Sequence, residues 1–264
     1  MQTEIPLPRN SANPSKSPVL FVLLGASNLA RGYSALVNCL IDCLHPHPVE
    51  VLHAMGPGRG YFAQGGVFNV SYSPIVASGI LDAARKRQPN ISKTLALITD
   101  IGNDIMYNVP ADKIIACLRS IIQELDAMGA DVFVNPIPMV LEKDVSERQF
   151  RMLRRVFYPH SPVAYFGAAD AVREINKFLQ EAAGGRIHLL PSVKDYCGVD
   201  KIHYSVFHSH KAWSEVMTAM CRVLPVEQRA TVSRLSVWKA LFANLGRLAF
   251  CDMVPIREKI SGTF

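Results

Sequence analysis

The chain has 264 residues, of which 49% are hydrophobic and 19% are charged. This length and balance predict an ordered globular protein with one large domain, and they exclude an intrinsically disordered chain. The formal net charge of +6 is compatible with an anionic partner, but no Lys/Arg block or aromatic–basic interleaving indicates nucleic-acid binding.

The six cysteines form no C-x-x-C pair, so the sequence supports neither a zinc ribbon nor a thioredoxin-type motif. Several of them lie in apolar stretches with helical spacing, which favours reduced core cysteines in a cytoplasmic protein. The apolar run at residues 18–26 is short for a signal peptide and supplies the first expected strand. No apolar run reaches the roughly 18 residues that a membrane span needs.

The chain divides into three expected parts. Residues 1–17, rich in Pro, Ser and Asn, predict a flexible N-terminal arm. Residues 18–224 alternate between strand-like and helix-like segments, and residues 225–264 form a C-terminal extension. Apolar runs, several ending at Gly or Pro, predict strands at residues 18–25, 49–56, 93–102, 130–138 and 186–193. Helical spacing predicts helices at residues 29–44, 73–87, 111–129, 145–158, 168–185 and 210–224. Such alternation predicts a parallel sheet with helices on both faces.

Polar residues and glycines follow four of the expected strands. They are Gly25-Ala26-Ser27, the GPGRG segment at residues 56–60, Gly102-Asn103-Asp104 and the DKIH segment at residues 200–203. Each group alone has an ordinary structural explanation, such as a helix cap for Ser27 or a turn for the glycines. Because the carboxyl ends of parallel strands meet at one edge of the sheet, the four groups together indicate a site.

These residue types suit acyl transfer. A serine hydroxyl is a poor nucleophile unless a base removes its proton, and His203 can be that base. Asp200, three residues before it, can orient the imidazole and stabilise its protonated form. The backbone N–H of Ser27, the N–H of a glycine after the second strand and the Asn103 amide can stabilise an oxyanion.

The four groups, in this order, resemble the conserved blocks of the SGNH (GDSL-type) hydrolase superfamily. The resemblance spans residues 18–224 and implies a three-layer α/β/α sandwich with a five-stranded parallel sheet of the flavodoxin-like kind. It makes Ser27 the nucleophile, Gly58 the oxyanion glycine with Gly60 as the alternative register, and Asn103 the third oxyanion donor. It also makes Asp200 and His203 the other triad members. One position departs from the pattern, because Ala26 stands where the G-D-S-L block has Asp.

We therefore expect a serine hydrolase that cleaves a carboxylic ester or thioester through an acyl-enzyme, with no cofactor and no metal site. A non-catalytic module that binds lipid or carbohydrate, and an acyltransferase that uses the same acyl-enzyme, are the alternatives. Arg59, Tyr61 and Tyr107 follow the second and third blocks and are the expected substrate-binding residues, with core packing as the alternative for the two tyrosines.

The C-terminal extension carries a further pattern. Apolar residues recur at helical spacing from residue 232 to residue 248, with basic residues between them and no acid between Glu227 and Asp252. This predicts an amphipathic helix that packs on its own domain or on a second subunit, or that lies peripherally in a membrane interface.

Overall fold

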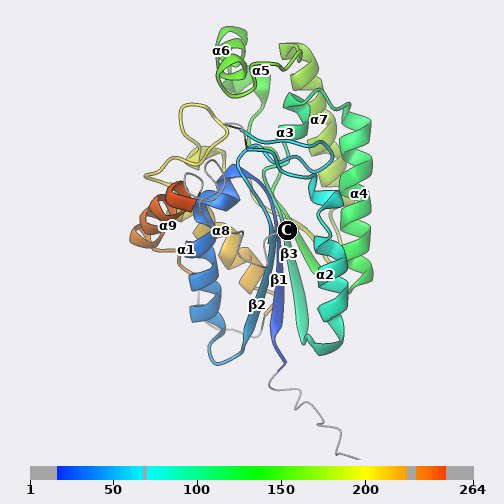
Figure 1. Ribbon diagram of the computed structural model, residues 1–264, viewed down its shortest axis with the longest axis vertical. Helices are drawn as coiled ribbons and strands as arrows, with labels where there is room; N and C mark the ends of the chain where they lie inside the picture. Colours follow the sequence, from blue (N-terminus) through cyan, green and yellow to red (C-terminus); the bar gives the residue numbers. More distant parts are fainter. Residues whose placement is uncertain (1–16, 68–69, 225–229, 248–264) are drawn as a thin grey trace, which may run out of the picture.

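The computed structural model describes residues 17–67, 70–224 and 230–247 (Figure 1). The expected N-terminal arm lies outside these residues except for Ser17, as do residues 225–229 and 248–264 of the C-terminal extension. The side chains of residues 244–247 are also not described.

The centre of the fold is one parallel sheet, as the sequence predicts. Its five strands stand in the order β2-β1-β3-β4-β5, and every pairing is parallel. The strands are β1 (Val19–Leu24), β2 (Val49–Ala54), β3 (Lys93–Ile98), β4 (Asp131–Val134) and β5 (Ile187–Leu189). All six side chains of β1 are buried, as expected for a strand covered on both faces.

Two helical layers cover the sheet, which confirms the three-layer sandwich (Figure 1). One layer contains α1 (Ser27–Leu44), α8 (Ser209–Cys221) and α9 (Arg234–Arg247), and the other contains α2 (Ile80–Arg87), α4 (Ala111–Ala127) and α7 (Tyr165–Ala182). Because side chains of a strand alternate between faces, Phe21 and Leu23 enter the core under the first layer, whereas Val22 and Leu24 enter the core under the second.

Two helices differ from their predicted extents. The helix expected at residues 73–87 is a short 3-10 turn, η2 (Ile75–Ala77), followed by α2, because Gly79 between them adopts a left-handed φ of 80°. The helix expected at residues 145–158 is the slightly shorter α6 (Glu147–Phe157), and a separate short helix that the sequence did not predict, α5 (Leu141–Asp144), precedes it. Ser146 caps the start of α6 in a capping box completed by Gln149, which explains why a new helix begins at this point.

Short helices gather at the carboxyl edge of the sheet. Helix α3 (Asn103–Met106) directly follows the loop after β3, and α5 and α6 lie together at the end of the molecule beyond this edge (Figure 1). They place part of residues 103–157 over the strand ends where the sequence predicts the site.

The C-terminal helix α9 packs on its own domain. Val237 and Ala240 of α9 are buried in the same core cluster as residues of α1 and α8, whereas Leu235 and Phe242 are 65% and 64% exposed. No helix among the described residues is long and apolar enough to cross a membrane.

Candidate active site

Ser27 is the first residue of α1, and only Gly25 and Ala26 separate it from the end of β1. A side chain at position 25 would not fit, because its Cβ would lie 2.8 Å from Thr99 Cγ2 and 3.0 Å from Leu29 Cβ. The glycine thus lets α1 start directly against the end of β3, which brings Ser27 to the carboxyl edge of the sheet.

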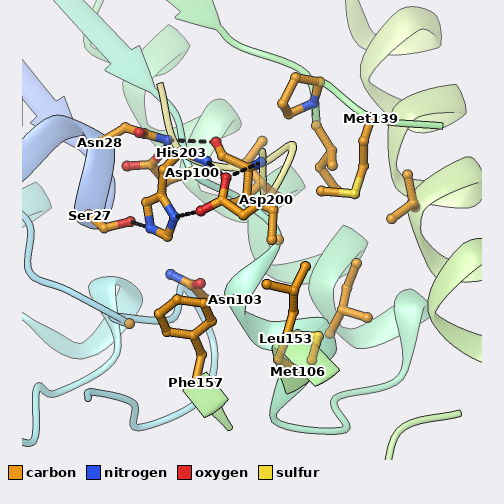
Figure 2. Close-up of a pocket in the computed structure, with 18 of the residues that line it drawn as sticks. Ser27, Asn28, Asp100, Asn103, Met106, Met139, Leu153, Phe157, Asp200 and His203 are labelled. Atoms are coloured by element: carbon orange, nitrogen blue, oxygen red, sulfur yellow. Dashed lines mark hydrogen bonds and ion pairs between the residues drawn. The ribbon is translucent and has the colours of Figure 1, made fainter. Parts of the chain in front are cut away.

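Ser27, His203 and Asp200 form a continuous hydrogen-bonded chain (Figure 2). The Ser27 hydroxyl oxygen lies 2.8 Å from His203 Nε2, and His203 Nδ1 lies 2.7 Å from Asp200 Oδ2. The other carboxylate oxygen, Asp200 Oδ1, accepts the backbone N–H groups of Ile202 at 3.0 Å and His203 at 2.9 Å. These bonds fix the carboxylate, and the carboxylate in turn fixes one nitrogen of the imidazole.

Asp200 is held in its charged form. Burial of the carboxyl group favours the neutral acid, but the hydrogen bonds and charge of His203, together with the two backbone N–H bonds, outweigh it. The pKa of Asp200 falls from its usual value near 3.8 to about 2. The carboxylate therefore remains an acceptor for His203 throughout the neutral pH range.

This lowered pKa predicts a pH-dependent part of the folding stability. Above pH 4 the ionised Asp200 stabilises the folded state, and this contribution is lost as the pH falls from about 4 to about 2, since only the unfolded chain binds the proton in that window. The difference in melting temperature between wild type and Asp200→Asn should therefore shrink over this interval. A difference that stays constant between pH 4 and pH 2 would contradict the shift.

Gly58 and Asn103 lie in the same pocket as these three residues. Gly58 has a left-handed φ of 74°, and no hydrogen bond involves its N–H or that of Ser27 within the part of the chain that is described. Asn103 is fixed from both ends of its amide: Nδ2 donates to the Arg59 carbonyl at 3.0 Å, and Oδ1 accepts the Tyr158 hydroxyl at 2.6 Å. Figure 2 shows the Asn103 amide beside the His203 imidazole.

Gly60, the alternative register, has a different environment. It does not line the pocket, and a Cβ at this position would lie 2.5 Å from Asp104 Oδ1. The Asp104 carboxylate is buried and accepts three consecutive backbone N–H groups, those of Tyr61, Phe62 and Ala63. Burial raises its pKa, although these three bonds oppose the rise. Gly60 and Asp104 therefore shape the loop rather than the pocket.

The structure places none of the expected substrate-binding residues on the pocket wall. Arg59 is 2% exposed and does not line the pocket. Its Nε donates to the Ser73 carbonyl at 2.9 Å. The reason is the tight turn at residues 56–59, in which the Arg59 N–H bonds back to the Gly56 carbonyl. Burial lowers the pKa of Arg59 to about 10.

Tyr61 and Tyr107 bind backbone instead of lining the pocket. The Tyr61 hydroxyl is fully buried between the ends of two strands, 2.9 Å from the Leu24 carbonyl and 2.7 Å from the Thr99 carbonyl. The Tyr107 hydroxyl donates to the Gly58 carbonyl at 2.5 Å and accepts the Gly66 N–H at 2.9 Å. Tyr107 therefore holds the loop that carries Gly58.

Asp100 is a site residue that the sequence analysis missed. Its Oδ2 accepts the backbone N–H groups of Ala26 at 2.9 Å and Leu29 at 3.1 Å, on either side of Ser27. A carboxylate at this helix N-terminus satisfies donors that the helix cannot satisfy itself, and it interacts favourably with the helix dipole. Asp100 has a left-handed φ of 58°, an uncommon conformation for a residue other than glycine. The acid absent at position 26 is thus matched by a carboxylate that arrives from the loop after β3.

Asn28 is a second site residue that the sequence analysis missed. Its Nδ2 donates to Asp100 Oδ1 at 2.8 Å and to the Ile202 carbonyl at 3.1 Å, while its Oδ1 accepts the Tyr204 N–H at 2.9 Å. Asn28 therefore ties the start of α1 to the backbone on both sides of His203. The two halves of the Ser27–His203 pair are held by one amide.

The replacement Asp100→Asn should lower kcat by about 10-fold to 100-fold, the range expected when a reacting group is slightly misplaced. An asparagine must turn its NH₂ group either toward the two helix N–H groups or toward the Asn28 amide, so one donor always faces another donor. We expect a stability loss of about 1–3 kcal/mol, measured by denaturant unfolding beside ester-hydrolysis kinetics. Wild-type kcat in the folded variant would show that the carboxylate does not position Ser27.

The chain thus combines an α/β/α fold of flavodoxin-like strand order with four ordered sequence blocks that resemble those of the SGNH hydrolases. Its sequence matches no protein-family model and no curated protein. Similar solved structures include an acetyl xylan esterase, AlAXEase, with 14% identity over 75% of this chain and 98% of that chain and a TM-score of 0.48. TesA is similar with 18% identity over 75% of this chain and 95% of that chain and a TM-score of 0.39. The psychrotrophic esterase EstA from Pseudoalteromonas sp. is similar with 13% identity over 77% and 98% of the two chains and a TM-score of 0.44. At these identities and TM-scores the likeness carries no argument about substrate, so the function rests on the geometry of the site.

Proposed function

We propose that this protein is a serine hydrolase of the SGNH type that cleaves a carboxylic ester or thioester through an acyl-enzyme. The observation that carries the proposal is the hydrogen-bonded chain from Ser27 through His203 to Asp200, which opens into a pocket. Each member has the partner that its role requires: a nucleophile beside a base, and a base beside a carboxylate that remains charged.

In the first half of the reaction, Ser27 Oγ attacks the carbonyl carbon of the substrate and His203 Nε2 takes the hydroxyl proton. The tetrahedral intermediate then collapses, the bond to the leaving group breaks, and His203 returns the proton to the departing oxygen or sulfur. In the second half, His203 takes a proton from water and the water oxygen attacks the acyl carbon. The bond between that carbon and Ser27 Oγ then breaks, and His203 returns the proton to Ser27 Oγ as the acid leaves. Asp200 keeps Nδ1 protonated throughout and stabilises the imidazolium.

Three donors are proposed for the oxyanion: the N–H of Ser27, the N–H of Gly58 and the Asn103 amide. The proposal is supported by the position of all three residues on the pocket wall and by the two backbone N–H groups, for which the described residues supply no acceptor. Tyr158 and the Arg59 carbonyl hold the Asn103 amide in a fixed orientation. Donors fixed before the reaction need no reorganisation when the charge develops.

A fluorophosphonate probe tests this function without knowledge of the natural substrate. The activated Ser27 should become covalently labelled, and peptide mass spectrometry should locate the adduct on residue 27. The variant His203→Ala should fold, lack the base and remain unlabelled. Failure of the folded wild-type protein to react would remove the support for catalysis and favour a non-catalytic binding module.

A further inference from the structure

The pocket at Ser27 continues into an apolar cavity that the triad chemistry does not use. The whole pocket, with the triad end included, encloses about 210 Å³, and its apolar part runs between α3, the loop after β4, the α5–α6 segment and α7. Figure 2 shows Met106 and Leu153 close together on one side of this space and Met139 at a distance from them, with the triad at the other end. Side chains from four segments between residues 103 and 172 thus converge on one cavity.

The wall of this cavity away from the triad is apolar. Ile137, Met139, Ala168 and Val172 line it and are 8%, 7%, 2% and 7% exposed, respectively. Leu153, on the inner side of α6, covers it from above. These side chains carry no hydrogen-bonding group apart from the weakly accepting thioether of Met139, and a space lined in this way does not hold water well but binds apolar matter.

The charged residues on the pocket wall make hydrogen bonds to the protein itself. Asp100 and Asp200 hold backbone N–H groups and His203, and the Arg154 guanidinium donates to the Val163 carbonyl at 2.5 Å. Asn135 donates to the Tyr204 hydroxyl at 2.7 Å, while its Oδ1 has no hydrogen-bond partner among the described residues. Both carboxylates of the pocket wall are thus occupied by donors of the protein itself.

The course of the reaction decides which half of the substrate occupies this cavity. The leaving group must depart, and water must then reach the acyl carbon beside His203, so the side of the site open to solvent has to stay accessible. The imidazole side chain is 26% exposed, which marks that open side. The acyl chain stays attached to Ser27 between the two half-reactions and can fill the closed side without blocking water.

We propose that the apolar cavity under α6 binds the acyl chain, and that the substrate is an ester or thioester of an unbranched fatty acid of medium length. This inference rests on the proposed function. A cavity of about 150 Å³ accommodates benzene, so the whole pocket of about 210 Å³ has room for an acyl chain of roughly eight carbons, counted from the carbonyl carbon at Ser27. Leu153 and Ala168 set the length of chain that fits.

A series of p-nitrophenyl esters from acetate to palmitate tests the chain length. Each methylene buried in an apolar site strengthens binding about fourfold, so kcat/KM for the octanoate should exceed that for the acetate by at least about 100-fold. The gain should end at roughly eight carbons, where the pocket is full. A preference for the acetate, or a steady increase up to the palmitate, would overturn the proposal even though both results are compatible with a hydrolase.

Two substitutions and one control connect the preference to this cavity. Leu153→Trp and Ala168→Leu fill the space from opposite walls, and each should shift the preferred chain toward shorter acids and lower the octanoate-to-acetate ratio at least about tenfold. Val156→Trp adds the same bulk to α6 at a side chain that is 67% exposed, and it should leave the ratio at the wild-type value. Equal ratios in all four folded proteins would place the acyl chain elsewhere.

Direct binding separates this proposal from the proposed function. Calorimetry of octanoate with the Ser27→Ala protein needs no catalysis. It should show saturable binding with a negative heat-capacity change. Adding Leu153→Trp to this protein should weaken the binding of octanoate at least about tenfold. Absence of binding would refute the acyl site, whatever the fluorophosphonate experiment shows. If the wild-type protein binds octanoate but does not hydrolyse esters, the acyl-chain site is supported and the proposed hydrolase function is refuted.

Discussion

Replacing Ser27 with alanine is expected to lower kcat for a p-nitrophenyl ester by about 10⁶-fold, the size of effect that removal of a serine nucleophile has in a triad hydrolase. The hydroxyl is the group that forms the acyl-enzyme, and no other serine contacts the His203 imidazole among the described residues. Since Ser27 makes no side-chain cap for α1, its loss should change the stability of the fold by only a few tenths of a kcal/mol, as for an ordinary surface substitution.

Steady-state hydrolysis and thermal unfolding of the two proteins measure these two effects separately. A matched control is Ser34→Ala on the same helix, which removes a hydroxyl outside the site and should leave kcat unchanged. Equal rates for wild type and Ser27→Ala would show that the serine at this helix start is structural and that the protein is not a serine hydrolase.

The second large effect is expected for Asp200→Asn, which should reduce kcat by about 10⁴-fold. The asparagine preserves the shape of the side chain but offers an NH₂ group or a neutral oxygen where the carboxylate now meets His203 Nδ1 at 2.7 Å. The imidazole then loses the partner that holds its catalytic tautomer and stabilises its charged form. KM should change much less, because Asp200 acts through His203.

The pH profile distinguishes this role from a structural one. With the pKa of Asp200 lowered to about 2, the wild-type enzyme should show no loss of kcat/KM from protonation of this carboxylate between pH 4 and pH 9. The Asp200→Asn variant, whose imidazole is no longer held in the tautomer that accepts the Ser27 proton, should recover part of the rate at the alkaline end of the profile, where hydroxide can take that proton. If Asp200→Asn keeps the wild-type kcat and changes only the melting temperature, Asp200 stabilises the loop without assisting His203.

The missing acid of the first block has a structural explanation. Asp100 brings its carboxylate to the N–H groups that flank Ser27, from a position 74 residues away in the chain. Ala26 is fully buried, so a carboxylate added there would stand next to the one already present, and two like charges in a buried site destabilise each other. The departure at position 26 and the carboxylate at position 100 are therefore best understood as one arrangement.

Much of the fold and the positions of five candidate site residues could be read from the sequence. Apolar runs of strand length alternate with helical spacing, and this pattern is local, so it predicts a parallel sheet covered on both faces. Polar residues at the strand ends follow from the same pattern, because a parallel sheet brings its carboxyl ends to one edge. Ser27, Gly58, Asn103, Asp200 and His203 are accordingly found in one pocket.

The orientation of side chains in the loops was decided only by the tertiary structure. Arg59 lies next to Gly58 in the chain, yet a tight turn sends it to Ser73, while Tyr158 reaches Asn103 from 55 residues away. Asp100, Asn28 and the apolar cavity under α6 also depend on contacts between segments that no local pattern connects. Hydrophobic periodicity encodes which face of an element is buried, but the partner of a polar group depends on which loops the packed helices bring together, and that is set only when the whole chain has folded.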